Sequence, residues 1–569
     1  MADTVIEIAL GKLEGFYKDG VYNFLGIPYA KAPIGYGRWA TPKSALPWKN
    51  VLKVDSFGPG SAQIRSGAIS SLPGDPQEND EDCLFVNIWT PSLNGEKLPV
   101  MFFIHGGAFL TGSTSQFMYN GAALSRKGVV VVSAAYRLGA LGFMAHPDLA
   151  DEETGLWGNF GLADQIEALS FVQQNISAFG GDTDNVTVFG QSAGSMSAVD
   201  LMGANTEHLF SESRRAVHRN VVDTAKAPLG PNGKPLFKKL IAQSGGVLSA
   251  TKDAAIRIAE RMAGELGVNK ITREAFCGLE TKAILAAQAK IVSSIDEGLG
   301  MPFQPVTDGL LLSRHPASQI ASGAGSDIDI LVGTNQDEFR LFALSVPGLD
   351  TLSLAGVAKL VGSYLEAAGI AKERLNADEV VDFYASRAAS GEASVSPRRL
   401  LEAIGTDWIF TVPVSRLAIS HALTGGKAFR YRFDKASPFM NGALGACHGI
   451  ELPFVFGTTT HPIVSLFSGN SQAVQTLSDK VQAAWISFAY NGDPSCETLG
   501  KWSEYELAGR QVMRFDDDSE VVDDLDEDIL SFWDTHLGKY GEAGPIEGAQ
   551  PSSVAHMATG FDDLRNNEK

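Results

Sequence analysis

Short apolar runs alternate with longer amphipathic segments along most of this 569-residue chain. Runs of about four to eight apolar residues, rich in Val, Ile, Leu and Phe, predict buried strands. They occur at 4–9, 84–89, 99–104, 129–135, 186–190, 238–243, 328–333 and 427–433. Between many of these runs, apolar residues recur with the period of a helix. The predicted helices cover 161–178, 252–266, 281–290, 354–369, 473–490 and 527–537.

This alternation predicts the fold class. Strands that are apolar throughout are typical of a sheet covered on both faces, and intervening helices supply the crossovers that parallel strands need. We therefore expect an α/β protein with a mostly parallel central sheet and helices on both faces. No boundary within 1–540 has the composition of an interdomain linker, so we expect one domain there. Residues 541–569 lack periodicity and are expected to form a loosely ordered tail.

Two segments depart from the alternating pattern. Residues 56–82 are rich in Gly, Pro, Ser and acidic residues, and a loop of this length is typical of a lid or a binding loop. Residues 205–230 carry Arg214, Arg215, His218, Arg219 and Lys226, and we interpret them as a surface insertion.

Composition excludes several classes of function. The chain has 46 Lys and Arg against 66 Asp and Glu, a net charge of -20, so we expect neither nucleic acid nor an anionic membrane as a partner. No apolar run approaches the roughly 18 residues of a membrane span. The N-terminus lacks the pattern of a signal peptide, and the cysteines lack metal-ligand spacing. We expect free thiols, no cofactor or metal and a cytoplasmic location; the cysteines are Cys83, Cys277, Cys447 and Cys496.

The sequence GQSAG at 190–194 predicts a nucleophilic serine. It stands between an apolar strand at 187–189 and an expected helix at 196–202, so Ser192 would lie on a sharp strand-to-helix turn. Such a turn strains the backbone and leaves no room for side chains two residues to either side, which explains the two glycines. Five-residue patterns also arise by chance, and the strand-turn-helix context is what favours the nucleophile.

A serine nucleophile needs a base, and the base needs a carboxylate that orients it. In folds with this kind of turn the order along the chain is Ser, acid, His. Glu338 follows an apolar strand, where a loop at the carboxyl edge of the sheet would lie, and Asp337 is equally well placed by this reasoning. His448 lies among small residues in GALGACHGIELPFVFG, a setting in which a loop can bring the imidazole over Ser192.

The tetrahedral intermediate of acyl transfer needs backbone N–H donors for its oxyanion. The segment HGGAF at 105–109 directly follows a predicted strand and is a candidate donor loop, although an ordinary glycine turn is the alternative. The candidate donors are Gly106, Gly107, Ala108 and, after the nucleophile, Ala193.

With these parts in place, the chain resembles the type-B carboxylesterase/lipase family, the cholinesterase-like branch of the α/β hydrolases, over about 5–540. The motifs LGIPYAKAP, EDCLFVNIW, FFIHGGAF, GLADQIEALSFVQQNISAFGGD, FGQSAGS and HGIELPFVFG follow the family's order. The resemblance implies an α/β-hydrolase fold and a triad of Ser192, Glu338 and His448, and so favours Glu338 over Asp337. It also implies that Ser244 supports the triad.

The same resemblance implies two buried ion pairs, Arg38 with Glu81 and Arg137 with Asp164.

Departures from the family pattern carry information of their own. Cys83 matches a cysteine that secreted relatives bridge, but no cysteine stands near Ala62, where its partner would be. Residues 66–82 contain no aromatic residue, so the cation–π contact by which cholinesterases bind a quaternary ammonium is not expected. Phe339 and Arg340 stand where relatives commonly have glycine, and we expect them to reshape the substrate pocket.

These observations predict a serine carboxylesterase that hydrolyses small-molecule esters, with small to medium acyl chains, through an acyl-enzyme. A lipase, or a hydrolase of amides, carbamates or β-lactams, could use the same site. A noncatalytic binding protein, like the neuroligin-like relatives, is disfavoured because those typically lack the nucleophile and Ser192 is present.

Overall fold

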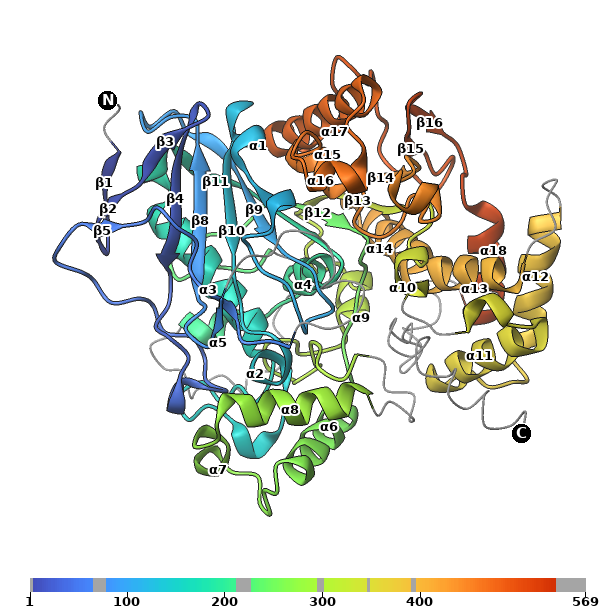
Figure 1. Ribbon diagram of the computed structural model, residues 1–569, viewed down its shortest axis with the longest axis horizontal. Helices are drawn as coiled ribbons and strands as arrows, with labels where there is room; N and C mark the ends of the chain where they lie inside the picture. The colour runs from blue at the N-terminus through green and yellow to red at the C-terminus, as the bar shows by residue number, and fades with distance from the viewer. Residues whose placement is uncertain are drawn as a thin grey trace.

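An eleven-stranded mixed sheet runs through the molecule (Figure 1). The structure is a computed structural model that describes residues 4–64, 78–210, 227–293, 301–344, 348–389 and 396–538. The strand order is β16-β15-β14-β13-β12-β11-β9-β10-β8-β4-β3. The strands are β3 (Phe16–Lys18), β4 (Val21–Pro28), β8 (Phe85–Thr90), β9 (Leu98–Ile104), β10 (Val130–Ala134), β11 (Gly181–Gln191), β12 (Lys239–Gln243), β13 (Asp329–Asn335), β14 (Ala428–Phe433), β15 (Val512–Phe515) and β16 (Glu520–Val522).

The centre of the sheet is parallel and its two margins are antiparallel. Every neighbouring pair from β10 through β9, β11, β12, β13 and β14 to β15 is parallel. The pairs β3–β4, β4–β8, β8–β10 and β15–β16 are antiparallel. The predicted α/β class, with a mostly parallel central sheet, is therefore confirmed.

Each of the predicted strands is present, but the first lies outside the central sheet. Residues 4–9 contain β1 (Val5–Ile8), which forms a small sheet with β2 (Gly11–Glu14) and β5 (Leu52–Lys53). The apolar pattern does not predict β4, because Asn23, Gly26 and Pro28 interrupt it. The predicted helices correspond to α3 (Phe160–Asn175), α6 (Lys252–Glu265), α8 (Thr281–Ser293), α11 (Leu354–Ala367), α17 (Gln472–Asn491) and α18 (Glu527–Leu537).

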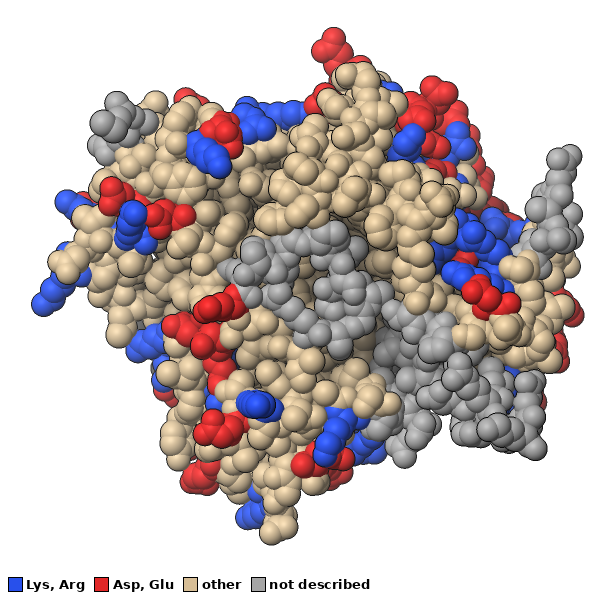
Figure 2. Space-filling view, viewed as in Figure 1, with Lys and Arg blue, Asp and Glu red and all other residues tan. Residues whose placement is uncertain are grey.

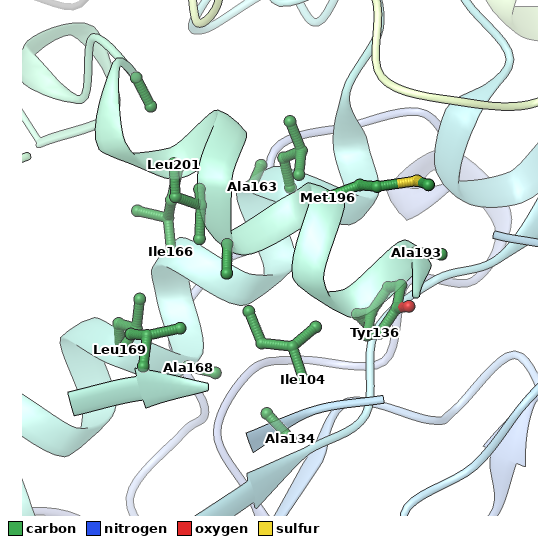
Figure 3. Close-up of a cluster of buried hydrophobic side chains, with 14 of the residues drawn as sticks. Ile104, Ala134, Tyr136, Ala163, Ile166, Ala168, Leu169, Ala193, Met196 and Leu201 are labelled. Carbon is green, nitrogen blue, oxygen red and sulfur yellow. The ribbon is translucent and has the colours of Figure 1, made fainter. Parts of the chain in front are cut away.

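Alternate residues of the central strands face two separate apolar clusters. In β9, Val100 and Phe102 belong to the cluster that includes α3 and α4 (Ala193–Met202), whereas Met101 and Phe103 belong to the cluster that includes α15 (Leu452–Phe456) and α17. Both faces are buried, which explains why these strands are apolar at every position. Figure 3 shows the first cluster, where side chains of α4 meet those of α3 and of the strands; the labelled residues include Ile104, Ala134, Ala163, Ile166, Met196 and Leu201.

A third apolar cluster lies at one end of the molecule (Figure 1). It is built from α11, α12 (Ala377–Ala389), α13 (Pro397–Thr406), the π-helical turn η7 (Asp407–Thr411) and α18, and we call it the helical layer. The rings of Trp408 and Trp533 pack inside it with 4.8 Å between their centroids. A group of basic side chains is visible near α13 in Figure 2. Within α13, Arg398 and Arg399 both pair with the buried Glu402.

Some predicted segments lie outside the described residues. These are 65–77 of the predicted lid-like loop, 211–226 of the predicted insertion, and the predicted tail 541–569. The single domain over 1–540 stays a prediction. All four cysteines are free. Within the described ranges, no helix combines the length and the apolar character needed to cross a membrane.

Both ion pairs implied by the family resemblance are present. The guanidinium of Arg137 binds Asp164 through two hydrogen bonds, Nε to Oδ2 at 2.7 Å and Nη2 to Oδ1 at 2.6 Å, and both side chains are buried. The backbone N–H of Arg137 also donates to the same carboxylate. Arg38 binds Glu81 in the same bidentate way, at 2.5 Å for each bond.

We predict that Arg137→Ala lowers the free energy of unfolding by about 3–5 kcal/mol, because it leaves the buried Asp164 carboxylate without its partner. Urea denaturation of the variant and the wild type measures the difference. Lys43→Ala is the control: it removes an exposed pair with Glu153 and should cost less than about 1 kcal/mol. Equal losses of unfolding free energy in the two variants would contradict the prediction that the buried pair stabilises the fold more than the exposed pair does.

Candidate active site

Ser192 lies on the turn between β11 and α4, in a backbone conformation that side chains rarely adopt. Its φ is 57° and its ψ is -127°. A Cβ on Gly190 would lie 2.4 Å from the backbone of Gly194, and a Cβ on Gly194 would lie 2.0 Å from the carbonyl oxygen of Ile104. Both glycines are therefore required for the turn. Helix α4 begins at Ala193, three residues before the expected start, because the turn leads directly into the helix.

Glu338 and His448 are hydrogen-bonded to each other and buried. The distance from His448 Nδ1 to Glu338 Oε2 is 2.6 Å, and the other carboxylate oxygen accepts the backbone N–H of Asn335 at 2.8 Å. Because Nδ1 faces a carboxylate, a neutral His448 carries its proton on Nδ1 and presents the lone pair of Nε2. This is the form in which a histidine acts as a base.

Asp337, the rival acid, points elsewhere. Its carboxylate pairs with Arg340 at 2.7 Å and accepts the backbone N–H of Ala446 at 2.9 Å. The adjacent residues Asp337 and Glu338 thus direct their carboxylates to different partners, Arg340 and His448. The structure brings Glu338, and not Asp337, to His448.

The Nε2 atom of His448 is hydrogen-bonded to the side-chain amide of Gln191, at 3.0 Å. Among the described residues, no hydrogen bond joins the Ser192 hydroxyl to this nitrogen. Nucleophile–base hydrogen bonds in ligand-free sites often form only when substrate binds. Gln191 directly precedes Ser192, so the neighbour of the candidate nucleophile is the residue that contacts Nε2 of the imidazole.

The HGGAF loop lies against Ser192. A Cβ on Gly106 would lie 2.9 Å from Cβ of Ser192, and the loop has positive φ at Gly107 (122°), Ala108 (54°) and Phe109 (60°). Within the described ranges, the N–H groups of Gly106, Gly107 and Ala108 donate no backbone hydrogen bond. Ala193 is the first residue of α4, where a helix has no acceptor for its N–H. The candidate oxyanion donors are therefore available.

Two contacts hold the start of this loop in place. The His105 ring stacks on Tyr136 with 4.6 Å between centroids, and the Tyr136 hydroxyl donates to the carbonyl oxygen of His105 at 2.8 Å. Strained backbone persists only where its surroundings determine it, and these contacts provide that support.

Two aromatic rings flank His448, and the sequence analysis did not predict either contact. Phe342, in α10 (Arg340–Ala343), lies 5.0 Å from the imidazole centroid, and Phe410, in η7, lies 4.9 Å from it. Both belong to the helical layer. Phe410 is 38 residues before His448 in the printed sequence, and nothing in the local pattern around it distinguishes it from an ordinary core residue.

Glu451 is a second buried acid beside the triad that the sequence analysis missed. It accepts hydrogen bonds from Asn335 Nδ2 at 2.6 Å and from Gln243 Nε2 at 3.1 Å. Burial, and then the charge of Glu338, raise its pKa to about 7. Its position three residues after His448, which places both on one side of a helical turn, is the signal that could have found it.

Ser244, which the resemblance implies as a support of the triad, makes no such contact. Its side chain is buried and φ is 53°, but in the described part of the chain its hydroxyl has no hydrogen-bond partner. The neighbouring Gln243 makes the link instead: its amide donates to Glu451 while its oxygen accepts Trp485 Nε1 at 3.1 Å.

Phe339 and Arg340, expected to reshape the substrate pocket, face the helical layer instead. Phe339 is fully buried in that layer's apolar cluster. Arg340 lines a polar cavity of about 420 Å³ between the turn that carries Glu338 and α13, and Ser192 and His448 do not line this cavity.

Comparison with known proteins identifies the group to which this fold and site belong. Residues 2–533 match the model of the carboxylesterase family, so the chain belongs to that family. It is 33% identical to the para-nitrobenzyl esterase of Bacillus subtilis (strain 168), over 92% of this chain and 97% of the relative. It is also 33% identical to the fumonisin B1 esterase of Sphingopyxis macrogoltabida, over 89% of this chain and 85% of the relative.

A solved structure shows the same architecture. The crystal structure of a carboxylesterase from Geobacillus stearothermophilus at pH 6.2 superposes with a TM-score of 0.78 at 32% identity, covering 93% of this chain and all of that one. The expected α/β-hydrolase fold is thus confirmed, and the relatives indicate a hydrolase that acts on ester bonds.

The raised pKa of Glu451 predicts a pH-dependent stability. The folded protein keeps a proton on this carboxyl up to about pH 7, whereas an unfolded Glu releases it near 4.5, so this group's contribution to stability falls as pH rises between these values. In Glu451→Gln the contribution is absent. We predict that the unfolding free energy of Glu451→Gln, relative to that of the wild type, increases as the pH rises through this window. Urea denaturation of both proteins from pH 4.5 to 8 measures the difference. The exposed Glu366→Gln should show no such trend, and a constant difference for Glu451→Gln would contradict the prediction.

Proposed function

We propose that this protein is a serine carboxylesterase in which Ser192 is the nucleophile, His448 the general base and Glu338 the residue that orients His448. The observation that carries the proposal is the buried 2.6 Å contact between His448 Nδ1 and Glu338, beside a serine held at φ 57°. The backbone N–H groups of Gly106, Gly107, Ala108 and Ala193, which lie next to Ser192, are the proposed oxyanion donors.

The proposed reaction has two acyl-transfer steps. Ser192 Oγ attacks the ester carbonyl carbon while His448 Nε2 takes its proton, and the imidazolium is stabilised by Glu338. The tetrahedral intermediate collapses as the alcohol leaves with the proton from His448, and the acyl group remains on Ser192. Water then attacks the acyl-enzyme with His448 again as the base, which releases the carboxylic acid and restores the serine.

We propose small to medium acyl chains as the preferred substrates. The two phenylalanines that flank His448 support this, since they occupy space beside the reacting atoms. A lipase, or a hydrolase of amides, carbamates or β-lactams, remains the alternative on the same site. The four free cysteines support our proposal of a cytoplasmic location.

We predict that a fluorophosphonate labels Ser192 and that Ser192→Ala abolishes both labelling and ester hydrolysis, with kcat falling by on the order of 10⁶. His448→Ala should lose a similar factor. Mass spectrometry of the labelled peptide locates the adduct. Ser249→Ala, a control at a buried serine whose hydroxyl is hydrogen-bonded to that of Thr307, should keep its activity. An adduct on any residue other than Ser192 would overturn the mechanism.

A series of p-nitrophenyl esters from acetate to palmitate tests the acyl preference. We predict that kcat/KM is highest for short or medium chains and falls about tenfold or more towards palmitate, because Phe342 and Phe410 occupy space beside His448. An increase with chain length, together with activation above the solubility limit of the ester, would instead indicate a lipase.

A further inference from the structure

The side chain of Gln191 is confined between the base and the oxyanion loop. It is buried, its Nε2 lies 3.0 Å from His448 Nε2, and its Oε1 lies so close to Gly106 that a Cβ there would be 2.9 Å away. Gln191 is the last residue of β11, and its backbone pairs with that of Gln243 in β12. In the structure the amide turns its Nε2 towards the imidazole and its Oε1 towards the oxyanion loop.

The contact places two donors in competition for one lone pair. Since Nδ1 of His448 donates to Glu338, the lone pair of neutral His448 is on Nε2, and the amide of Gln191 donates into it. The Ser192 hydroxyl must donate its proton to the same lone pair during attack. A hydrogen bond to the neutral form of a base disfavours its protonated form.

Two acids also face His448. Glu338 contacts Nδ1, and the buried Glu451 interacts electrostatically with the ring from the following turn. Cys447, the preceding residue, is a buried thiol whose pKa lies far above its usual range because of burial and these acids. Asp337 is turned towards Arg340, and the elements that carry Phe342 and Phe410 present apolar rings. Gln191 is therefore the neutral donor at Nε2, opposite the acid at Nδ1.

We propose that Gln191 is a positioning residue whose amide, by donating to Nε2, holds His448 aimed at the nucleophile until substrate binds and Ser192 replaces the amide at Nε2. This inference rests on the proposed function, because it assigns a role relative to the His448 base. It predicts that the pH at which activity is lost on the acid side is set partly by residue 191.

Two substitutions separate this role from simple packing. Gln191→Glu has nearly the same shape but places a carboxylate at Nε2, where it stabilises the imidazolium; the acid limb of kcat/KM should move to higher pH by about one unit or more. Gln191→Met keeps the length and removes the N–H donor, so the limb should move in the same direction by a smaller amount. A packing role would lower kcat/KM equally at every pH and leave the limb in place.

The experiment is a pH profile of kcat/KM from pH 5 to 9 with a short p-nitrophenyl ester, since this parameter reports ionisations of the free enzyme. The rate of fluorophosphonate labelling over the same range provides a second readout. Gln173→Met is the matched control, because Gln173 is a buried glutamine that donates to the carbonyl oxygens of Thr183 and Leu236, away from the triad. Its acid limb should coincide with that of the wild type.

The Glu451→Gln background removes the buried acid next to His448 whose pKa lies near 7. The shift caused by Gln191→Glu should persist in that background, and its disappearance would assign the effect to Glu451 and overturn the inference. Acid limbs that coincide in the wild type and Gln191→Met would also overturn it, and this variant decides the matter if Gln191→Glu fails to fold. Failure of the proposed function is recognised separately, by labelling away from Ser192 or by activity of Ser192→Ala.

Discussion

The packing of α4 against the central strands, in one apolar cluster with α3, is the constraint on which the site depends. Met196 and Leu201 of α4 belong to the apolar cluster that includes Ile104 of β9 and Ile166 of α3, as Figure 3 shows. This burial holds the helix so close to β9 that a Cβ on Gly194 would meet the carbonyl oxygen of Ile104. The strained backbone of Ser192 is therefore stabilised by the packing of the core together with its own hydrogen bond, from the Ser192 N–H to the carbonyl oxygen of Gln243 at 2.9 Å.

The parallel register then assembles the remaining parts. Strands β9, β11, β12 and β13 are consecutive neighbours, so their carboxyl ends meet at one edge of the sheet. The HGGAF loop follows β9, Ser192 follows β11 and Glu338 follows β13. The loop after β14 adds His448. Distance along the chain has no bearing on this assembly, and Gln191 and His448 are in contact although 257 residues separate them.

The electrostatics of the site depend on amides as much as on acids. Glu338 and Glu451 are both buried next to one imidazole, and each accepts hydrogen bonds from neutral N–H groups: the backbone of Asn335 for Glu338, and the side chains of Asn335 and Gln243 for Glu451. Buried carboxyl groups without such donors would be costly. The helical layer places Phe342 and Phe410 against the imidazole of His448. This layer, which has its own apolar cluster, therefore also forms part of the surroundings of His448.

The sequence by itself determined the features that are local along the chain. The apolar period identified the central strands, and the strand-turn-helix pattern around GQSAG identified the strained turn at Ser192. Local patterns predict such features because backbone strain and strand burial restrict the residue types at fixed spacings. Only the tertiary structure shows the contacts themselves: Glu338 at His448 Nδ1, as the resemblance implied, Gln243 and not Ser244 at Glu451, and Gln191 at His448 Nε2. Those outcomes depend on side-chain directions and on partners tens to hundreds of residues away, which no local pattern encodes.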